Sequence, residues 1–224
     1  MGDVRRLIVF DLDGTLVDSR RDLADAANAL IRERGGAPLP EDAIGRMVGE
    51  GARVLVERAL TAAGLAVDAS SLPRFLDLYD ERLLNTTAPY PGIPQTLETL
   101  ASYATIAVLT NKPLAPSLRI LDALALSRSI AATVGGDGPF PKKPDPAALL
   151  HLMQRFSASP RATAMVGDSW IDRETARRAG TAICLARYGF GYEGVQSTHL
   201  QGDEGLADDP VQIVAIIGRL LDIS

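Results

Sequence analysis

Three short apolar runs, each followed at once by polar residues, constrain the fold of this chain most strongly. The runs cover residues 7–10, 105–109 and 162–166. The residues that follow them are Asp11 to Asp13, Thr110 to Lys112, and Gly167 to Ser169. Apolar runs of this length, rich in branched residues, are typical of buried parallel strands. Because ligands in open parallel sheets bind beyond the carboxyl ends of the strands, the three polar ends together predict one binding site.

The first polar end carries two carboxylates one residue apart. Asp11 and Asp13 follow the run 7–10, and the alternation of a strand points both to the same side. Gly14 then allows a sharp turn. Two adjacent carboxylates repel each other unless a cation or a shared proton relieves them. They are either solvated turn residues or part of a site, and the other two polar strand ends favour the site.

The segment from residue 19 to residue 88 has apolar residues at helical spacing and no strand pattern. Expected helices cover residues 20–34, 51–63 and 72–84. From Pro89 onward, strand and helix patterns alternate, as in a parallel sheet covered on both faces. We therefore predict an α/β fold with a Rossmann-like parallel sheet core and an inserted helical cap domain. The predicted core comprises residues 1–18 and 89–224, and the predicted cap residues 19–88.

Lysine is rare in this chain, and its positions are informative. Lys112, Lys142 and Lys143 are the only lysines among 23 basic residues. All three lie in or near the second and third polar segments, where a compact ammonium suits a point contact with phosphate or carboxylate. We interpret Lys143 as functional and Lys142 as a solvated neighbour.

Four motifs along the chain resemble those of the haloacid dehalogenase-like phosphohydrolases. They are VFDLDGT from Val9, VLTNK ending at Lys112, KKPDPAAL from Lys142, and VGDSWID from Val166. All four occur in the order typical of the family, and the resemblance covers essentially the whole chain. The resemblance implies an enzyme that hydrolyses phosphate monoesters.

The resemblance also implies roles for residues that match the motifs. Asp11 is expected to attack phosphorus and form an aspartyl phosphate. Asp13 is expected to protonate the leaving oxygen and then to activate water. Thr110, with Asn111 and neighbouring backbone N–H groups, is expected to hold phosphate oxygens. Lys143 is expected to balance the negative charge of the nucleophile and the phosphate.

A divalent cation is the cofactor that the resemblance implies. Oxygen ligands favour Mg²⁺, and the expected ligands are the Asp11 carboxylate, the Asp13 backbone carbonyl and Asp168. Asp172 follows Asp168 by about one helical turn, so it is expected either to bind the metal or to hold a neighbouring group.

Within the family, three segments are most similar to the phosphoglycolate phosphatase subgroup. They are residues 48–60, 90–100 and 110–116, and Gly191 to Gly194 is a weaker match. Two residues depart from the pattern, namely Trp170, which is bulky, and Arg53, which stands where an acidic residue is expected. Trp170 is expected to pack against the cap. The expected partner is therefore a small phosphorylated metabolite, with 2-phosphoglycolate favoured.

The loop that contains Gly49, Gly51 and Arg53 has two interpretations. It is either a turn that begins a helix or a surface whose N–H groups and guanidinium read a substrate carboxylate. A Gly-rich turn does not decide between them.

Individual residues argue against several other functions known for the same fold. Asp13 argues against a dehalogenase, and the absence of lysine from residues 19–88 argues against Schiff-base chemistry in the cap. A sugar-phosphate phosphatase and a nucleotide pyrophosphatase remain the enzymatic alternatives. A catalytically silent binding module is a remote alternative, disfavoured because Asp11, Asp13, Lys143 and Asp168 are all present.

The amino-acid composition limits the binding partners and the cellular compartment that we expect for this protein. A net charge of −5 argues against general nucleic-acid binding. The single cysteine, Cys184, fits a reducing compartment, and no apolar run is long enough to span a membrane. We expect a cytoplasmic enzyme that is a monomer or a homodimer and binds no membrane. His151 and His199 have no partner at metal-ligand spacing and are expected to have no role.

Overall fold

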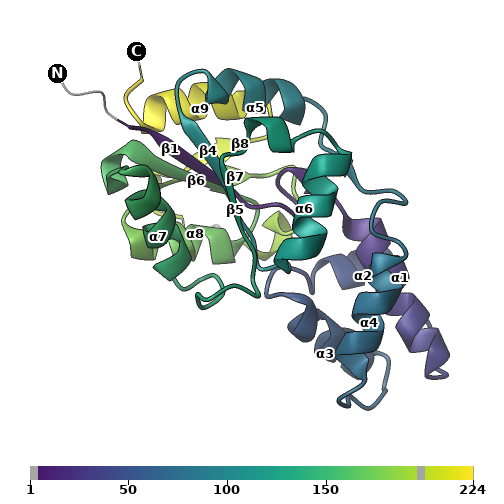
Figure 1. The fold of residues 1–224 in the computed structure, drawn as a ribbon. Helices are drawn as coiled ribbons and strands as arrows, with labels where there is room; N and C mark the ends of the chain where they lie inside the picture. The colour runs from purple at the N-terminus through teal and green to yellow at the C-terminus, as the bar shows by residue number, and fades with distance from the viewer. Residues whose placement is uncertain (1–4, 196–199, 224) are drawn as a thin grey trace.

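A six-stranded parallel sheet forms the centre of the computed structural model, which describes residues 5–195 and 200–223 (Figure 1). The strand order is β5-β4-β1-β6-β7-β8. Their bounds are β1 Leu7–Phe10, β4 Thr105–Leu109, β5 Ala132–Val134, β6 Thr163–Gly167, β7 Ala182–Ala186 and β8 Gly205–Ala207. The predicted α/β fold with a parallel sheet is confirmed. His199 lies outside the described residues.

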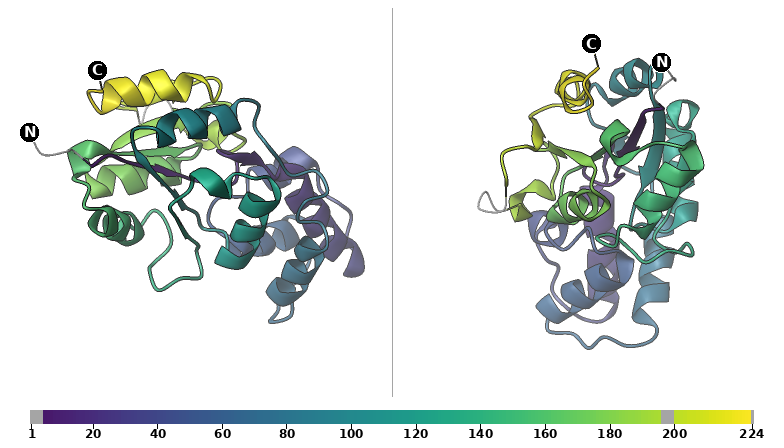
Figure 2. Two further views of the ribbon diagram at one scale, coloured as in Figure 1. Left: turned by 45° about the horizontal axis from the view of Figure 1, so that its top comes forward. Right: turned by 90° about the vertical axis from the view of Figure 1, so that its left-hand side faces the viewer.

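Helices cover both faces of this sheet (Figure 2). They are α5 Ile93–Ala101, α6 Leu114–Ala123, α7 Ala147–Phe156, α8 Trp170–Ala179 and α9 Gln212–Leu220. Helices α5 and α9 pack together on one face, and α7 and α8 on the other. Short 3₁₀ turns occur at Ser127–Ser129, Pro160–Ala162 and Tyr192–Gly194. None of the described helices has the length and apolar character needed to cross a membrane.

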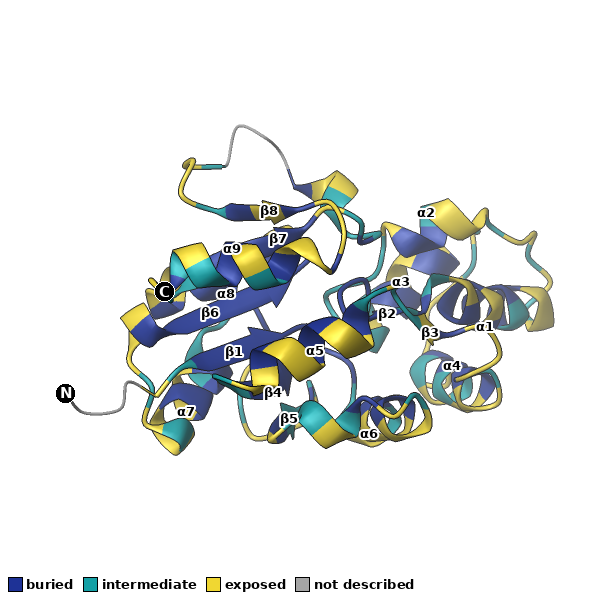
Figure 3. Cartoon of the chain, turned by 90° about the horizontal axis from the view of Figure 1, so that it is seen from above, coloured by how far each residue is buried: buried dark blue, intermediate teal, exposed yellow. Residues whose placement is uncertain are grey.

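Strand β1 lies at the middle of the sheet and is buried on both faces. Leu7, Ile8, Val9 and Phe10 have no exposed surface (Figure 3). Ile8 and Phe10 belong to the apolar core on the α5 and α9 side, whereas Leu7 and Val9 belong to the core on the α7 side. A strand covered on both faces needs apolar residues at every position, which explains the unbroken run.

A helical lobe lies between β1 and the rest of the sheet in sequence, at one end of the molecule (Figure 1). Its helices are α1 Arg20–Glu33, α2 Glu41–Gly45, α3 Ala52–Ala62 and α4 Ser71–Asp80. The short α2 is absent from the sequence prediction, and α4 ends earlier than expected. After Asp80 the backbone forms three-residue turns instead, with the N–H of Arg82 donating to the carbonyl of Tyr79. Leu83 nevertheless stays buried, which accounts for the longer apolar pattern.

Two adjacent connections join the lobe to the sheet domain. β2 (Val17–Asp18) and β3 (Ala88–Pro89) pair antiparallel. The side chain of Asp22 on α1 also accepts hydrogen bonds from the N–H and hydroxyl groups of Thr86 and Thr87, at 2.6–3.0 Å. Two-residue strands have no periodicity, so sequence patterns do not detect them. Where one domain ends and the other begins stays a prediction.

Candidate active site

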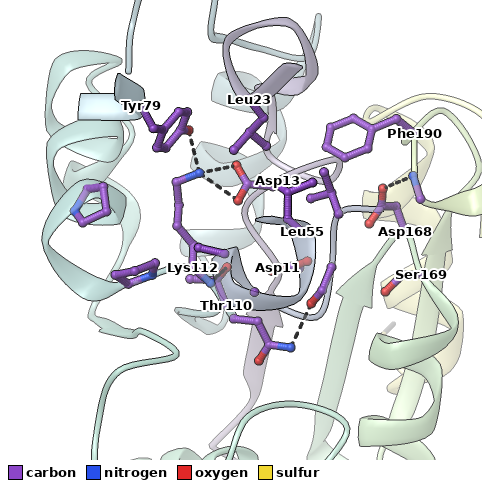
Figure 4. Close-up of a pocket in the computed structure, with 18 of the residues that line it drawn as sticks. Asp11, Asp13, Leu23, Leu55, Tyr79, Thr110, Lys112, Asp168, Ser169 and Phe190 are labelled. Atoms are coloured by element: carbon purple, nitrogen blue, oxygen red, sulfur yellow. Dashed lines mark hydrogen bonds and ion pairs between the residues drawn. The ribbon is translucent and has the colours of Figure 1, made fainter. Parts of the chain in front are cut away.

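The carboxyl ends of the three central strands bring the predicted site residues together. β1 pairs with β4 on one side and with β6 on the other. Asp11, Thr110 and Asp168 follow these strands directly, and all three line one cavity between the sheet and the helical lobe (Figure 4). The parallel register therefore places groups from three distant parts of the chain side by side.

Three carboxylates form a buried acidic cluster at this edge. Oxygens of Asp11, Asp168 and Asp172 all lie within 4.8 Å of one another. Burial, with the charge of Asp172 next to it, raises the pKa of Asp11 to about 6, although Lys143 opposes the shift. Burial and the two neighbouring carboxylates also raise the pKa of Asp168 well above its usual range. Such a cluster is unfavourable unless protons or a cation neutralise it, and an all-oxygen donor set fits a hard divalent cation.

Lys143 supplies the positive charge closest to the cluster. Its Nζ lies 2.6 Å from Oδ1 of Asp172 and 2.9 Å from Oδ1 of Asp11. Burial alone would lower the pKa of Lys143, but the charges of Asp11 and Asp172 outweigh it and raise that pKa. Oδ1 of Asp11 is buried and accepts no well-aligned hydrogen bond from the described residues. The Asp11 carboxylate is therefore paired by charge yet retains a free acceptor.

Asp172 uses both carboxylate oxygens within the protein. Oδ2 accepts from the hydroxyl of Ser169 at 2.6 Å and from its N–H at 3.1 Å, which forms a capping box at the start of α8. Oδ1 accepts from Lys143. Through these hydrogen bonds, Asp172 on α8 holds both Ser169, which follows β6, and Lys143.

The side chain of Asp13 points away from the acidic cluster and toward the lobe (Figure 4). Its Oδ1 accepts from the hydroxyl of Ser19 at 2.5 Å, and both its oxygens lie 3.0 Å from Nζ of Lys112. Asp11 and Asp13 therefore lie in two environments, and the expectation that both side chains point to the same side is wrong, because β1 ends at Phe10 and strand alternation does not extend to Asp13.

Lys112 is a site residue to which sequence analysis gives no individual role. It is buried, and besides Asp13 it donates to the hydroxyl of Tyr79 on α4, at 2.7 Å. The rarity of lysine and its place after the second apolar run were available signals. Nothing in the sequence indicated Tyr79 as its partner, because the two lie 33 residues apart.

Thr110 and Asn111 both line the cavity, and Asn111 also braces the loops around it. Nδ2 of Asn111 donates to the carbonyls of Gly49 and Lys143, at 2.9 and 3.0 Å. Its Oδ1 accepts from the N–H of Lys143 at 2.9 Å. The amide therefore connects the lobe to the loop that carries the catalytic lysine candidate. Oγ1 of Thr110 accepts from the N–H of Lys112 at 3.2 Å.

The structure brings two of the three predicted lobe residues to the cavity. Gly49 and Gly51 line it and have φ angles of +120° and +92°, which favour glycine. A Cβ on Gly51 would lie 2.6 Å from Nζ of Lys142. Arg53 is exposed on α3 and is not among the residues that line the cavity. The structure does not bring its guanidinium to the site.

The loop after β7 completes the acidic end of the cavity and was missed as a site element. The N–H of Gly191 donates to Oδ2 of Asp168 at 2.7 Å, and Phe190 lines the cavity. A Cβ on Gly189 would lie 2.2 Å from the carbonyl of Gly14 and 2.3 Å from Cβ of Asp168. The alternating glycines in this segment were the available signal, since glycine permits close backbone approach.

Apolar side chains form most of the lobe's wall of this cavity. They are Leu23, Val48, Ala52, Leu55, Phe75 and Leu76. The cavity holds about 60 Å³ of space that a water-sized molecule can occupy. One water needs at least about 10–15 Å³ on that measure. The space beside the carboxylates is therefore small, with room for only a few water molecules.

Two further residues singled out in the sequence lie apart from the cavity lining. Trp170 is 44% exposed at the start of α8, and its expected packing against the cap stays a prediction. His151 packs against Phe140, with ring centroids 4.7 Å apart and the ring planes tilted by 35°.

The chain is similar to known proteins in both sequence and structure. A family model for the haloacid dehalogenase-like hydrolases matches residues 5–180. Phosphoglycolate phosphatase from Rhodospirillum rubrum is 42% identical over 86% of this chain and 83% of its own length. That from Caulobacter vibrioides is 38% identical over 85% and 82%. The crystal structure of a predicted phosphoglycolate phosphatase from Haemophilus somnus has a TM-score of 0.87 and 32% identity, covering 95% of this chain and 97% of its own. The resemblance carried by the four motifs is confirmed.

Proposed function

We propose that this chain, which belongs to the haloacid dehalogenase-like hydrolases, is a Mg²⁺-dependent phosphatase whose substrate is 2-phosphoglycolate. The observation that carries the phosphatase assignment is the separation of the two motif carboxylates. Asp11 lies in the acidic cluster beside Lys143, and the Asp13 side chain lies on the side of the lobe. Such an arrangement allows one carboxylate to react with phosphorus while the other handles the proton of the leaving oxygen.

The residues of the chain divide the reaction into two steps. Asp11 attacks phosphorus, the ester bond to the leaving oxygen breaks, and Asp13 gives that oxygen its proton. Asp13 then takes a proton from water, which attacks the aspartyl phosphate and releases inorganic phosphate. Lys143 offsets negative charge throughout, and Thr110 binds a phosphate oxygen.

Mg²⁺, when bound, would supply the charge compensation that an anionic nucleophile needs to approach an anionic phosphate. Its proposed ligands are the carboxylates of Asp11 and Asp168 and the backbone carbonyl of Asp13. We assign Asp172 to holding Lys143 and the start of α8, because both its oxygens already accept hydrogen bonds. Of the two roles expected for Asp172, this proposal takes the one in which it holds neighbouring groups.

The substrate assignment follows from the relatives and from the small cavity. Curated relatives at 36–42% identity are phosphoglycolate phosphatases, and the confined apolar wall favours a two-carbon leaving group over a sugar. A cytoplasmic location, a monomeric or dimeric state and the absence of nucleic-acid binding stay predictions.

A phosphate-release screen tests the proposal. The purified protein with Mg²⁺ should hydrolyse 2-phosphoglycolate with a kcat/KM at least tenfold above that for sugar phosphates, which is about 1.4 kcal/mol of transition-state preference. Asp11→Asn should lose at least about 10⁴-fold, as for removal of other covalent nucleophiles. Equal rates for sugar phosphates would refute the substrate assignment alone. Undiminished turnover by Asp11→Asn would refute the mechanism.

A further inference from the structure

The cavity has a single cationic side chain in its lining. Among the described residues that line it, Lys112 is the only lysine or arginine. Lys143 lies behind Asp11, in contact with Asp11 and Asp172, and Arg53 lies outside the lining. The rest of the lobe's wall is apolar, apart from the hydroxyl of Tyr79 and the backbone of the Gly49 to Gly51 loop. A negatively charged leaving group therefore has one ammonium to meet.

We propose that Lys112 and Tyr79 together bind the carboxylate of the substrate's leaving group and so select acidic phosphate esters. This inference rests on the proposed function and assigns its specificity to a pair that joins the second motif to helix α4. It replaces Arg53 as the candidate for reading the carboxylate.

The position of Lys112 suits this role. Its Nζ lies 3.0 Å from both oxygens of Asp13, which protonates the leaving oxygen in the proposed mechanism. In 2-phosphoglycolate the carboxyl carbon is two bonds beyond that oxygen. A leaving oxygen beside Asp13 thus places the carboxylate near the ammonium. Lys112 can give up one of its two contacts with Asp13 without losing the pair, which frees an N–H for the substrate.

Tyr79 supplies a second donor to the same place. Its hydroxyl accepts from Lys112 at 2.7 Å, and no described residue accepts the proton of that hydroxyl. Burial raises the pKa of Tyr79 to about 12, so the phenol stays protonated at neutral pH. The ammonium also lies 4.5 Å from the centre of the Tyr79 ring, which fixes the two groups together. Ammonium and phenol lie side by side on the wall of a buried pocket, where charged hydrogen bonds are stronger than in water.

The test compares 2-phosphoglycolate with its uncharged amide analogue, phosphoglycolamide, in the same Mg²⁺ buffer. The measured quantity is the ratio of kcat/KM for the acid to that for the amide. Lys112→Met should lower this ratio at least tenfold, and Tyr79→Phe should lower it about three- to tenfold. Arg53→Met is the matched control, because Arg53 is an exposed cation of α3 outside the lining, and it should leave the ratio unchanged.

The variant ratios and the wild-type ratio distinguish failure of this inference from failure of the proposed function. If Lys112 only supports Asp13 or the fold, Lys112→Met slows both substrates equally and the ratio does not move, which overturns the inference. Tyr79→Phe keeps the ion pair of Lys112 with Asp13, so an unchanged ratio in this variant also overturns it, even where Lys112→Met fails to fold. The wild-type ratio tests the proposed substrate independently. A wild type that prefers the acid while both variants retain that preference refutes this inference alone.

Discussion

Nζ of Lys143 lies between two carboxylates, 2.6 Å from Asp172 and 2.9 Å from Asp11. Only one of the two, Asp11, lines the cavity. Asp172 is fully buried and also caps helix α8. Asp172 therefore holds Lys143 from the side away from the cavity, whereas Asp11 contacts Lys143 from the cavity side.

Asp172→Asn should reduce both stability and activity. Loss of one charge from a buried ion pair costs about 3–5 kcal/mol, and we expect the lower end because asparagine still accepts a hydrogen bond. The less constrained Lys143 should lower kcat/KM about 10–100-fold. Urea unfolding and steady-state kinetics measure the two effects. Asp122→Asn, at an exposed helical position, should change stability by less than about 0.5 kcal/mol. Matching effects in both variants would argue against the role of Asp172.

Gly14→Ala should displace Asp168. A Cβ on Gly14 would lie 1.9 Å from Oδ2 of Asp168, and the φ of Gly14 is +82°. Gly35→Ala is a close control, because Gly35 has a φ of +78° and no atom within 4 Å of the added carbon. Both variants pay about 1–2 kcal/mol for the left-handed backbone. Only Gly14→Ala should also weaken Mg²⁺ binding and lower kcat/KM at least tenfold, as calorimetric titration and kinetics would show.

Asp13→Asn should slow catalysis while leaving metal affinity nearly unchanged. The Asp13 side chain contacts Lys112 and Ser19 and lies away from the acidic cluster. Loss of a positioned acid and base should lower kcat about 10²–10⁴-fold. Titration with Mg²⁺ should give a dissociation constant within about threefold of wild type, whereas Asp168→Asn should lose about 10–100-fold in affinity. Metal binding lost in Asp13→Asn would contradict the proposed division between its backbone and its side chain.

The metal-free protein should lose stability as pH rises. The pKa of Asp11 is about 6 in the folded state and 3.8 in the unfolded state, so the folded state binds more protons between these values. Its free energy of unfolding should therefore fall from about pH 4 to about pH 6, by up to roughly 3 kcal/mol for this group. Mg²⁺ binds the ionised carboxylates and should stabilise the protein more at pH 8 than at pH 5.

Thermal unfolding at several pH values, with and without Mg²⁺, measures this effect. Asp11→Asn removes one titrating group and should flatten the metal-free profile. A metal-free wild type that becomes more stable from pH 4 to pH 6 would show that other carboxylates dominate the linkage.

Local sequence patterns were sufficient to predict the sheet and the ends of its strands. The unbroken apolar runs reflect burial on both faces, which is a property of each strand by itself. Asp11, Thr110 and Asp168 could be placed at one edge from the sequence, because parallel strands present their carboxyl ends together. The helical lobe was visible for a similar reason, since its apolar residues recur with the period of a helix.

The contacts between elements were decided only by the tertiary structure. Lys112 meets Tyr79 from a helix of the lobe, and Gly191 reaches Asp168 from the loop after β7. Arg53 is turned outward by the way in which α3 packs. Periodicity defines which face of an element is buried and where the element ends. It does not define which side chain of another element lies 3 Å away, because that distance depends on how the lobe and the sheet domain pack against each other.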